Sequence, residues 1–179
     1  MFSNKDLRKL IIPLVIEQLL AVTIGMADTV MVSSCGEAAV SGISLVDSIN
    51  FLLITLFSSL ATGGAVIASQ YIGRGDHKSA SLAAKQLFYA SLALSAVLGI
   101  IAVFFRKPVL NMVFGSIEAD VMAHAQIYFL LSAISYPFLA VYNAGAALFR
   151  SMGDSRTTML ISILMNTINI VGNAILIYG

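Results

Sequence analysis

Five long apolar stretches, separated by short polar segments, dominate the pattern along this chain. They lie at residues 10–33, 49–72, 82–105, 121–149 and 159–178. Each reaches the roughly 20 residues that a helix needs to cross about 30 Å of hydrocarbon. No alternating strand pattern competes, and backbone exposed to lipid requires helices or closed barrels. The pattern therefore predicts an all-α integral membrane protein with five transmembrane helices.

Several local features refine this prediction. The fourth stretch is longer than the others and contains Pro137, so we expect a tilt or a kink there. The outer segments 34–48 and 106–120 contain apolar residues, which favours short interfacial helices. The third stretch has only Ser91 and Ser95 as a polar pair, which indicates a lipid-exposed or purely structural helix.

The two segments on the inner side resemble each other. Their sequences are Gly75-Asp76-His77-Lys78 and Gly153-Asp154-Ser155-Arg156. We expect the glycine to end one helix and the aspartate to cap the next, while the basic residue holds the loop in the cytoplasm.

The composition supports the membrane class and excludes several others. Charged residues make up 11% of the chain, against about 25% in a soluble domain. The net charge of +1 excludes a broad electrostatic footprint for nucleic acid. A single cysteine, Cys35, can form neither an internal disulfide nor a zinc cage. No nucleophile–base pair, metal-ligand spacing or nucleotide loop points to an enzyme or to a cofactor.

The first stretch has two features of a signal sequence: Lys5, Arg8 and Lys9 precede it, and Val32-Ser33-Ser34-Cys35 loosely resembles a lipoprotein cleavage site. Its apolar run is too long for a signal peptide, and Glu17 and Asp28 interrupt it. We therefore interpret it as a membrane helix.

Basic residues predict the orientation. With a cytoplasmic N-terminus, the inner segments carry eight basic residues and the outer segments two, which follows the positive-inside rule. The inner residues are Lys5, Arg8, Lys9, Arg74, Lys78, Lys85, Arg150 and Arg156, and the outer ones are Arg106 and Lys107. We expect a multi-pass protein of the plasma or inner membrane, with Gly179 on the outer side.

Asp28 is the most unusual residue of the first stretch. A carboxylate at the centre of a membrane helix costs about 2.5 to 3.5 kcal/mol. Such a residue usually faces a bundle interior or a wet cavity and binds a proton, an ion or a substrate; the alternative is an aspartate near the outer helix end that reaches the interface. Glu17 lies eleven residues earlier, so both carboxylates face nearly the same side of the helix at different depths.

Polar side chains also recur at helical spacing in three other stretches. The sets are Thr55, Ser59, Thr62 and Ser69; Ser132, Tyr136 and Asn143; and Asn166, Asn169 and Asn173. For the hydroxyl set we favour ordinary packing between membrane helices. Three amides on one face each need hydrogen-bond partners. They form either a structural amide zipper or, together with Asp28, a small site for a cation or a proton.

Four motifs in this order resemble the multidrug and toxic compound extrusion (MATE) family of transporters. They are Leu10-Ile11-Ile12-Pro13 through Glu17-Gln18-Leu19-Leu20 and Met26-Ala27-Asp28-Thr29-Val30-Met31-Val32; Gln70-Tyr71-Ile72-Gly73-Arg74-Gly75; Phe149-Arg150-Ser151-Met152-Gly153-Asp154-Ser155-Arg156-Thr157; and Asn169 to Asn173 ahead of Ile177-Tyr178-Gly179. The likeness covers essentially the whole chain.

The resemblance implies an exporter with two six-helix lobes. It implies export of cationic or amphipathic toxic compounds, driven by inward sodium or proton flow without an enzymatic cofactor. Asp28 would be the coupling carboxylate of the first lobe, with Asn169 and Asn173 in the same pocket. Glu17, Tyr136, Asn143 and Asn166 are further candidates for the cavity lining. Some relatives carry an aspartate where Asn173 stands, so this chain lacks a second carboxylate there.

The length departs from the family. Five helices are an incomplete lobe without its sixth helix, and alternating access needs both halves. We expect residues 1–179 to be the N-terminal portion of a longer transporter whose C-terminal half is the missing partner, with membrane lipid around it. Two alternatives stay open: a lipid-linked oligosaccharide flippase of related fold, disfavoured because the stretches carry no Lys or Arg near their middles, and a non-transporting membrane module that needs a partner subunit.

Overall fold

A computed structural model describes residues 4–178 of the chain, with side chains over residues 7–177. The side chain of Lys5 and the position of Gly179, both used in the predicted orientation, lie outside these residues. The described chain folds into five long helices joined by short turns: α1 (Asn4–Ser33), α2 (Glu37–Gly73), α3 (His77–Phe114), α4 (Ala119–Ser151) and α5 (Ser155–Tyr178). All five are long and apolar enough to cross a membrane. The predicted all-helical fold with five such helices is therefore confirmed.

One of the two segments predicted to lie on the outer side, 34–48, differs from its prediction. The prediction of a separate interfacial helix within 34–48 is wrong, because α2 begins at Glu37 and continues unbroken to Gly73. Its first turns bury Ala39, Gly42 and Val46 at helical spacing. Burial of this face stabilises the helix beyond the apolar stretch.

The segment after the third stretch does contain a short helical piece. The backbone leaves helical geometry at Phe105, where φ is −111° and ψ is 21°, and then resumes to Phe114. Pro108 follows this break by three residues. A proline ring clashes with the carbonyl four residues earlier, so a helix bends at this point. In α4, by contrast, Pro137 lies within a single helix.

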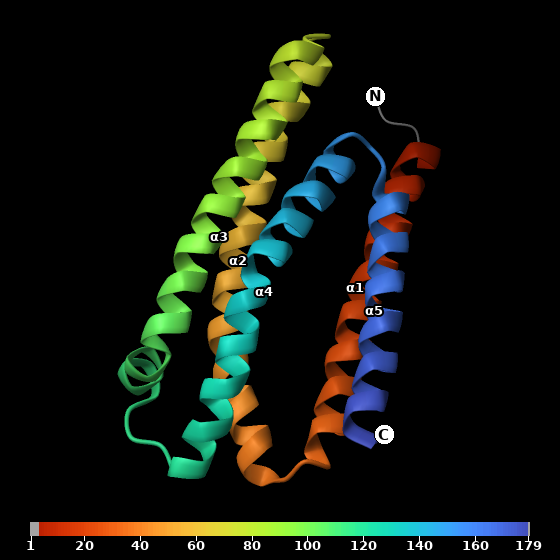
Figure 1. The fold of residues 1–179 in the computed structure, drawn as a ribbon. Helices are drawn as coiled ribbons and strands as arrows, with labels where there is room; N and C mark the ends of the chain where they lie inside the picture. The colour runs from red at the N-terminus through yellow and green to blue at the C-terminus, as the bar shows by residue number, and fades with distance from the viewer. Residues whose placement is uncertain (1–3, 179) are drawn as a thin grey trace. The chain divides into compact units, whose positions relative to one another are not determined.

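The chain divides into two compact units. The first contains α1 and α5, which lie side by side and run in the same direction (Figure 1). Polar contacts between α1 and α5 join residues far apart in sequence, as in the pairs Glu17–Thr158 and Asp28–Asn173.

The second unit contains α2, α3 and α4, in which α2 and α4 run parallel and α3 runs against both (Figure 1). Small residues let the helices approach closely, as is usual between membrane helices. A Cβ atom on Gly42 would lie 2.9 Å from the Val121 carbonyl oxygen of α4, and one on Gly99 would lie 3.0 Å from the Ala133 carbonyl oxygen. Fully buried large side chains from α2, α3 and α4 form a core of this unit: Val46, Phe57, Leu110, Phe129 and Tyr136.

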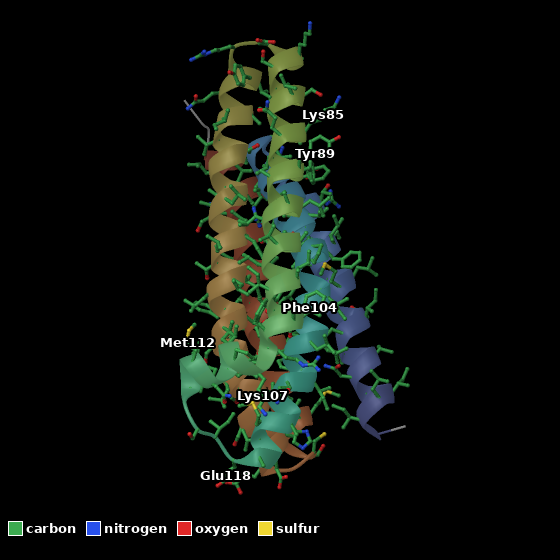
Figure 2. The ribbon with its side chains drawn as sticks, turned by 60° about the vertical axis from the view of Figure 1, so that its left-hand side comes forward. Lys85, Tyr89, Phe104, Lys107, Met112 and Glu118 are labelled. Carbon is green, nitrogen blue, oxygen red and sulfur yellow. The ribbon has the colours of Figure 1, made fainter. Side chains whose placement is uncertain are left out.

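One face of α3 packs and the other is exposed. Ser91 and Ser95 are buried, and they share a helix face with buried Leu87 and Ala102. On the outside, Tyr89 and Phe104 expose about three quarters of their surface (Figure 2). The serine pair is therefore part of the packed face of this helix, which fits the structural interpretation.

The α2–α3 and α4–α5 turns, which are predicted to be the inner ones, have the geometry that their sequences predict. Gly75 and Gly153 adopt φ of 76° and 85°, a region that glycine enters without steric cost. The Asp76 carboxylate accepts the Ser79 N–H at 3.0 Å, and the Asp154 carboxylate accepts the Thr157 N–H at 3.1 Å. Hydrogen bonds from Ser79 and from Thr157 lower the pKa of Asp76 and of Asp154, respectively.

Candidate functional site

Asp28 of α1 meets the asparagine face of α5. The Asn173 side-chain N–H₂ donates to Oδ1 of Asp28 at 2.7 Å and to Oδ1 of Asn169 at 3.4 Å. Asp28 and Asn173 are partly buried, and Asn169 is exposed. Three of the predicted site residues thus lie together in the α1–α5 unit.

Helical spacing explains which amides take part. Asn169 and Asn173 stand one turn apart on α5, so one side chain reaches along the helix to the other. Asn166 donates to the Ser162 hydroxyl of its own helix at 3.3 Å. It extends the polar face, but its hydrogen bond stays within α5.

Glu17 contacts α5 at another level. Its Oε2 lies 3.4 Å from the Thr158 hydroxyl oxygen, and Thr158 is buried. The same hydroxyl lies 2.9 Å from the Ser155 carbonyl oxygen. The eleven-residue spacing predicted that Glu17 and Asp28 face one side of α1, and their contacts with α5 confirm it.

Asp28, Asn169 and Asn173 together form what we call the Asp28 group. Its chemistry suits a small hard cation or a proton. The available ligand atoms are a carboxylate oxygen and amide carbonyl oxygens, the ligand types that hard cations take. An ionised carboxylate offers about four acceptor positions, and the structure uses one of them on Asp28. Among the described residues, no group of three or more His, Cys, Asp or Glu side chains could hold a metal ion.

The two candidates on α4 make contacts within the other unit. The Tyr136 hydroxyl is fully buried and donates to Oδ1 of Asn50 at 2.8 Å. The Asn143 side chain donates to the Leu139 carbonyl of its own helix at 2.9 Å. Tyr136 therefore belongs to an interhelical network, whereas the hydrogen bond of the Asn143 amide stays within α4.

That network includes residues that the sequence pattern did not single out as a site. Asn50 donates to the Ser132 hydroxyl at 3.1 Å, and the Tyr128 hydroxyl donates to Oδ1 of Asp47 at 2.9 Å. Asn50 also lies 3.5 Å from the same Asp47 oxygen. Asp47 and Asn50 share a helix face, which was the available signal, but they fall at the boundary of a segment predicted to lie outside the apolar stretch.

In the hydroxyl set of α2, Thr55, Ser59 and Thr62 are exposed and Ser69 is half-buried, so these side chains do not pack between the described helices as predicted. Thr55, Ser59 and Thr62 each donate to the carbonyl four residues earlier, and Ser69 donates to the carbonyl three residues earlier, at 2.7 to 2.8 Å. These hydroxyls satisfy themselves on their own helix.

Comparisons with known proteins show what this chain is similar to. A family model described as MatE matches residues 13–175. An uncharacterized transporter of Bacillus subtilis, YisQ, is 34% identical over 175 residues, which cover 93% of this chain and 36% of that protein. A probable multidrug resistance protein, NorM, of Thermotoga maritima is 28% identical, with 98% of this chain and 38% of that protein covered.

Solved structures show the same helical arrangement. A MOP superfamily transporter from Pyrococcus furiosus matches with a TM-score of 0.87 at 25% identity, over 97% of this chain and 38% of that one. The chain therefore spans less than two fifths of the length of these relatives.

Proposed function

The chain belongs to the MatE family, and from this premise we propose that it is the N-terminal part of an ion-coupled exporter. Its cargo would be cationic or amphipathic toxic compounds, and inward flow of sodium or protons would drive their export. The name of the Thermotoga maritima relative, a probable multidrug resistance protein, supports this cargo class. A second half of the same transporter would complete the pathway, since rocking of two halves requires both.

One observation carries the proposal: the 2.7 Å hydrogen bond between Asn173 and Asp28, residues 145 positions apart. Partly buried carboxylates in membrane helices are costly and mark ion or proton pathways. Here the carboxylate accepts a hydrogen bond from an amide, a group that can rearrange and that does not itself titrate.

This pairing suggests how an ion would act on the helices. A proton on Asp28, or a cation among the oxygens of Asp28, Asn169 and Asn173, competes with the Asn173 N–H for the same carboxylate. Binding would then change the contact between α1 and α5. A ligand shifts a conformational equilibrium only through such a difference in affinity between two states.

The deciding experiment replaces Asp28 by asparagine in the complete transporter. We expect Asp28→Asn to abolish efflux and to return drug resistance to the level of cells without the transporter, while the amount of protein in the membrane is unchanged. The matched control is Asp120→Asn, an exposed carboxylate in the first turn of α4, which should transport normally. Undiminished resistance in the Asp28 variant contradicts the proposal.

Gradients imposed on vesicles distinguish sodium from protons as the coupling ion. A proton-coupled exporter responds to a pH gradient at constant sodium, and a sodium-coupled one responds to a sodium gradient at constant pH. Asp28→Asn should remove whichever response the unaltered protein shows.

The partial nature of the chain is tested on the source DNA. An open frame downstream of the Gly179 codon that encodes a sixth helix and a second six-helix half is the expected result. An immediate stop would favour a module that depends on a partner subunit.

A further inference from the structure

A groove lies between α1 and α5 at the end where both apolar runs begin. Its volume is about 610 Å³, and its lining combines the charged side chains of Arg8, Lys9, Asp154 and Arg156 with the apolar side chains of Ile12 and Ile16. Arg8 precedes Asp28 by twenty residues, which is about 30 Å along a helix. The groove therefore lies toward the other end of α1 from Asp28.

The polar part of the groove is positively charged. Three cationic side chains line it against one carboxylate, Asp154. That carboxylate is already engaged, because its two oxygens accept from the Thr157 N–H at 3.1 Å and from the Thr157 hydroxyl at 2.6 Å. Arginine presents a planar fork of donors that matches phosphate oxygens. The charged part therefore suits a phosphate group.

The apolar part of the groove continues along the membrane-spanning surface of α1. Ile12, Ile16 and Leu19 stand four and seven residues apart on one face, and they are 54%, 37% and 62% exposed. Side chains at this spacing form one continuous stripe. A ligand seated in the groove thus meets cations at one end and a hydrocarbon surface at the other.

We propose that this groove binds an anionic phospholipid, with its phosphate between Arg8 and Arg156 and an acyl chain along Ile12, Ile16 and Leu19. Basic pockets between helices on the cytoplasmic side are a known means of binding such headgroups. A soluble phosphate would use only the cations and would leave the apolar stripe uncovered. The complementarity of both parts is what favours a lipid.

Native mass spectrometry of the detergent-solubilised protein tests the proposal. The protein used is the chain with any sequence that continues its reading frame. It is titrated with phosphatidylglycerol and, separately, with phosphatidylcholine of the same acyl chains. We expect phosphatidylglycerol to bind more tightly, and the double variant Arg8→Gln with Arg156→Gln to weaken it about thirtyfold, since each cation contributes about 1 kcal/mol.

A matched control removes the same charge from the other inner turn. The double variant Arg74→Gln with Lys78→Gln changes exposed residues of the α2–α3 turn, and it should alter phosphatidylglycerol binding by no more than about twofold. Equal losses in the two double variants would mean that only the overall charge matters, and the proposed site would be wrong. Equal binding of the two lipids would overturn it as well.

Two further measurements complete the test. Arg8→Lys with Arg156→Lys keeps the charge, so it should retain most binding and show that the glutamine variant did not lose it by misfolding. If the lysine variant binds as weakly as the glutamine variant while both unfold at the temperature of the unaltered protein, charge is not what holds the lipid. Displacement by glycerol phosphate at concentrations equal to those of the lipid would contradict an acyl-chain contribution and indicate a free-anion site.

Discussion

Asp28 has more acceptor capacity than its surroundings use. Within the described residues its hydrogen bond comes from the Asn173 side chain, whose N–H₂ also donates to Asn169. The Asp28 carboxylate therefore has acceptor positions that this hydrogen bond does not use. In the proposed mechanism, a proton or a cation at this carboxylate competes with the Asn173 N–H, so that binding changes the contact between α1 and α5.

Removing the Asn173 amide measures how much its hydrogen bond to Asp28 contributes to stability. We expect Asn173→Ala to lower the stability of the solubilised protein by about 1 to 2 kcal/mol, because the interhelical hydrogen bond to Asp28 is lost. The control is Asn143→Ala, whose amide donates to the Leu139 carbonyl of its own helix. Thermal unfolding in detergent measures both variants. Equal shifts would show that the Asp28 contact contributes no more than a local one.

The buried tyrosine of the other unit gives a second test at this scale. In Tyr136→Phe the ring still packs edge-on against Phe57, at 6.1 Å between centroids, but the oxygen of Asn50 loses its donor. An unsatisfied buried acceptor costs about 1 to 3 kcal/mol; Asn50 is half-buried, so we expect a lower unfolding temperature with a cost toward the lower end of this range. Tyr89→Phe, at a position that is 72% exposed, should be nearly neutral. A neutral Tyr136→Phe variant would mean that water replaces the hydroxyl.

The two polar groups were unequally predictable. Asp28 and the Asn169–Asn173 pair stand out because carboxylates and amides are rare inside long apolar stretches. The Asp47–Tyr128 contact joins residues 81 positions apart, and nothing in local spacing says which helix faces which. Asp47 was also assigned to an outer segment, because the hydropathy pattern marks where apolar residues begin and not where a helix begins.

At the scale of the helices, close approach depends on glycine where backbones nearly touch. A Cβ on Gly42 would lie 2.9 Å from the Ala125 nitrogen and from the Val121 oxygen, whereas one on Gly63 would meet nothing within 4 Å. Both glycines lie within α2, so their intrinsic helix propensities are the same. Packing is therefore the difference between them.

These two glycines form a matched pair of substitutions. Gly42→Ala should destabilise the protein by about 1 to 3 kcal/mol, because backbone atoms of α4 would have to move. Gly63→Ala should be neutral or stabilising by up to about 1 kcal/mol, since alanine favours a helix. Unfolding temperatures of the two variants decide the matter. A stable Gly42→Ala variant would mean that α2 and α4 separate at little cost.

The helix caps of the inner turns predict a response to acid. Hydrogen bonds from Ser79 and Thr157 hold the pKa of Asp76 and of Asp154 below the ordinary value of 3.8. A lowered pKa in the folded state means that the ionised caps stabilise the fold above pH 3.8, and that this contribution is lost as the pH falls through the folded-state values. We expect the unfolding temperature to fall between pH 5 and about pH 2.

The double variant Asp76→Asn with Asp154→Asn isolates this effect. Asparagine can still cap a helix, but it does not titrate, so the variant should lose less stability over the same pH range. An identical acid response in the variant and the unaltered protein would assign the response to other carboxylates. The caps were predictable from sequence, since Gly-Asp turns act through neighbouring residues.

At the scale of the whole molecule, the distribution of basic residues predicts which side of the membrane each turn occupies. The inner set includes Arg74 and Lys78 beside the α2–α3 turn, and the outer set consists of Arg106 and Lys107. The parallel course of α1 and α5 (Figure 1) agrees with three membrane crossings, α2, α3 and α4, between them. It holds equally for the inverted orientation, so the side itself needs a direct measurement.

Cys35 allows that measurement without an introduced cysteine. It is the only cysteine of the chain, and it is exposed in the turn between α1 and α2, which lies outside the cell if the N-terminus is cytoplasmic. A membrane-impermeant maleimide should therefore label intact cells that carry the unaltered protein. In a Cys35→Ser background, His77→Cys places a thiol at an exposed position in the α2–α3 turn, and it should react only after the cells are permeabilised. The reverse pattern would invert the topology, and it would move the groove around Arg8 and Arg156 to the outer leaflet.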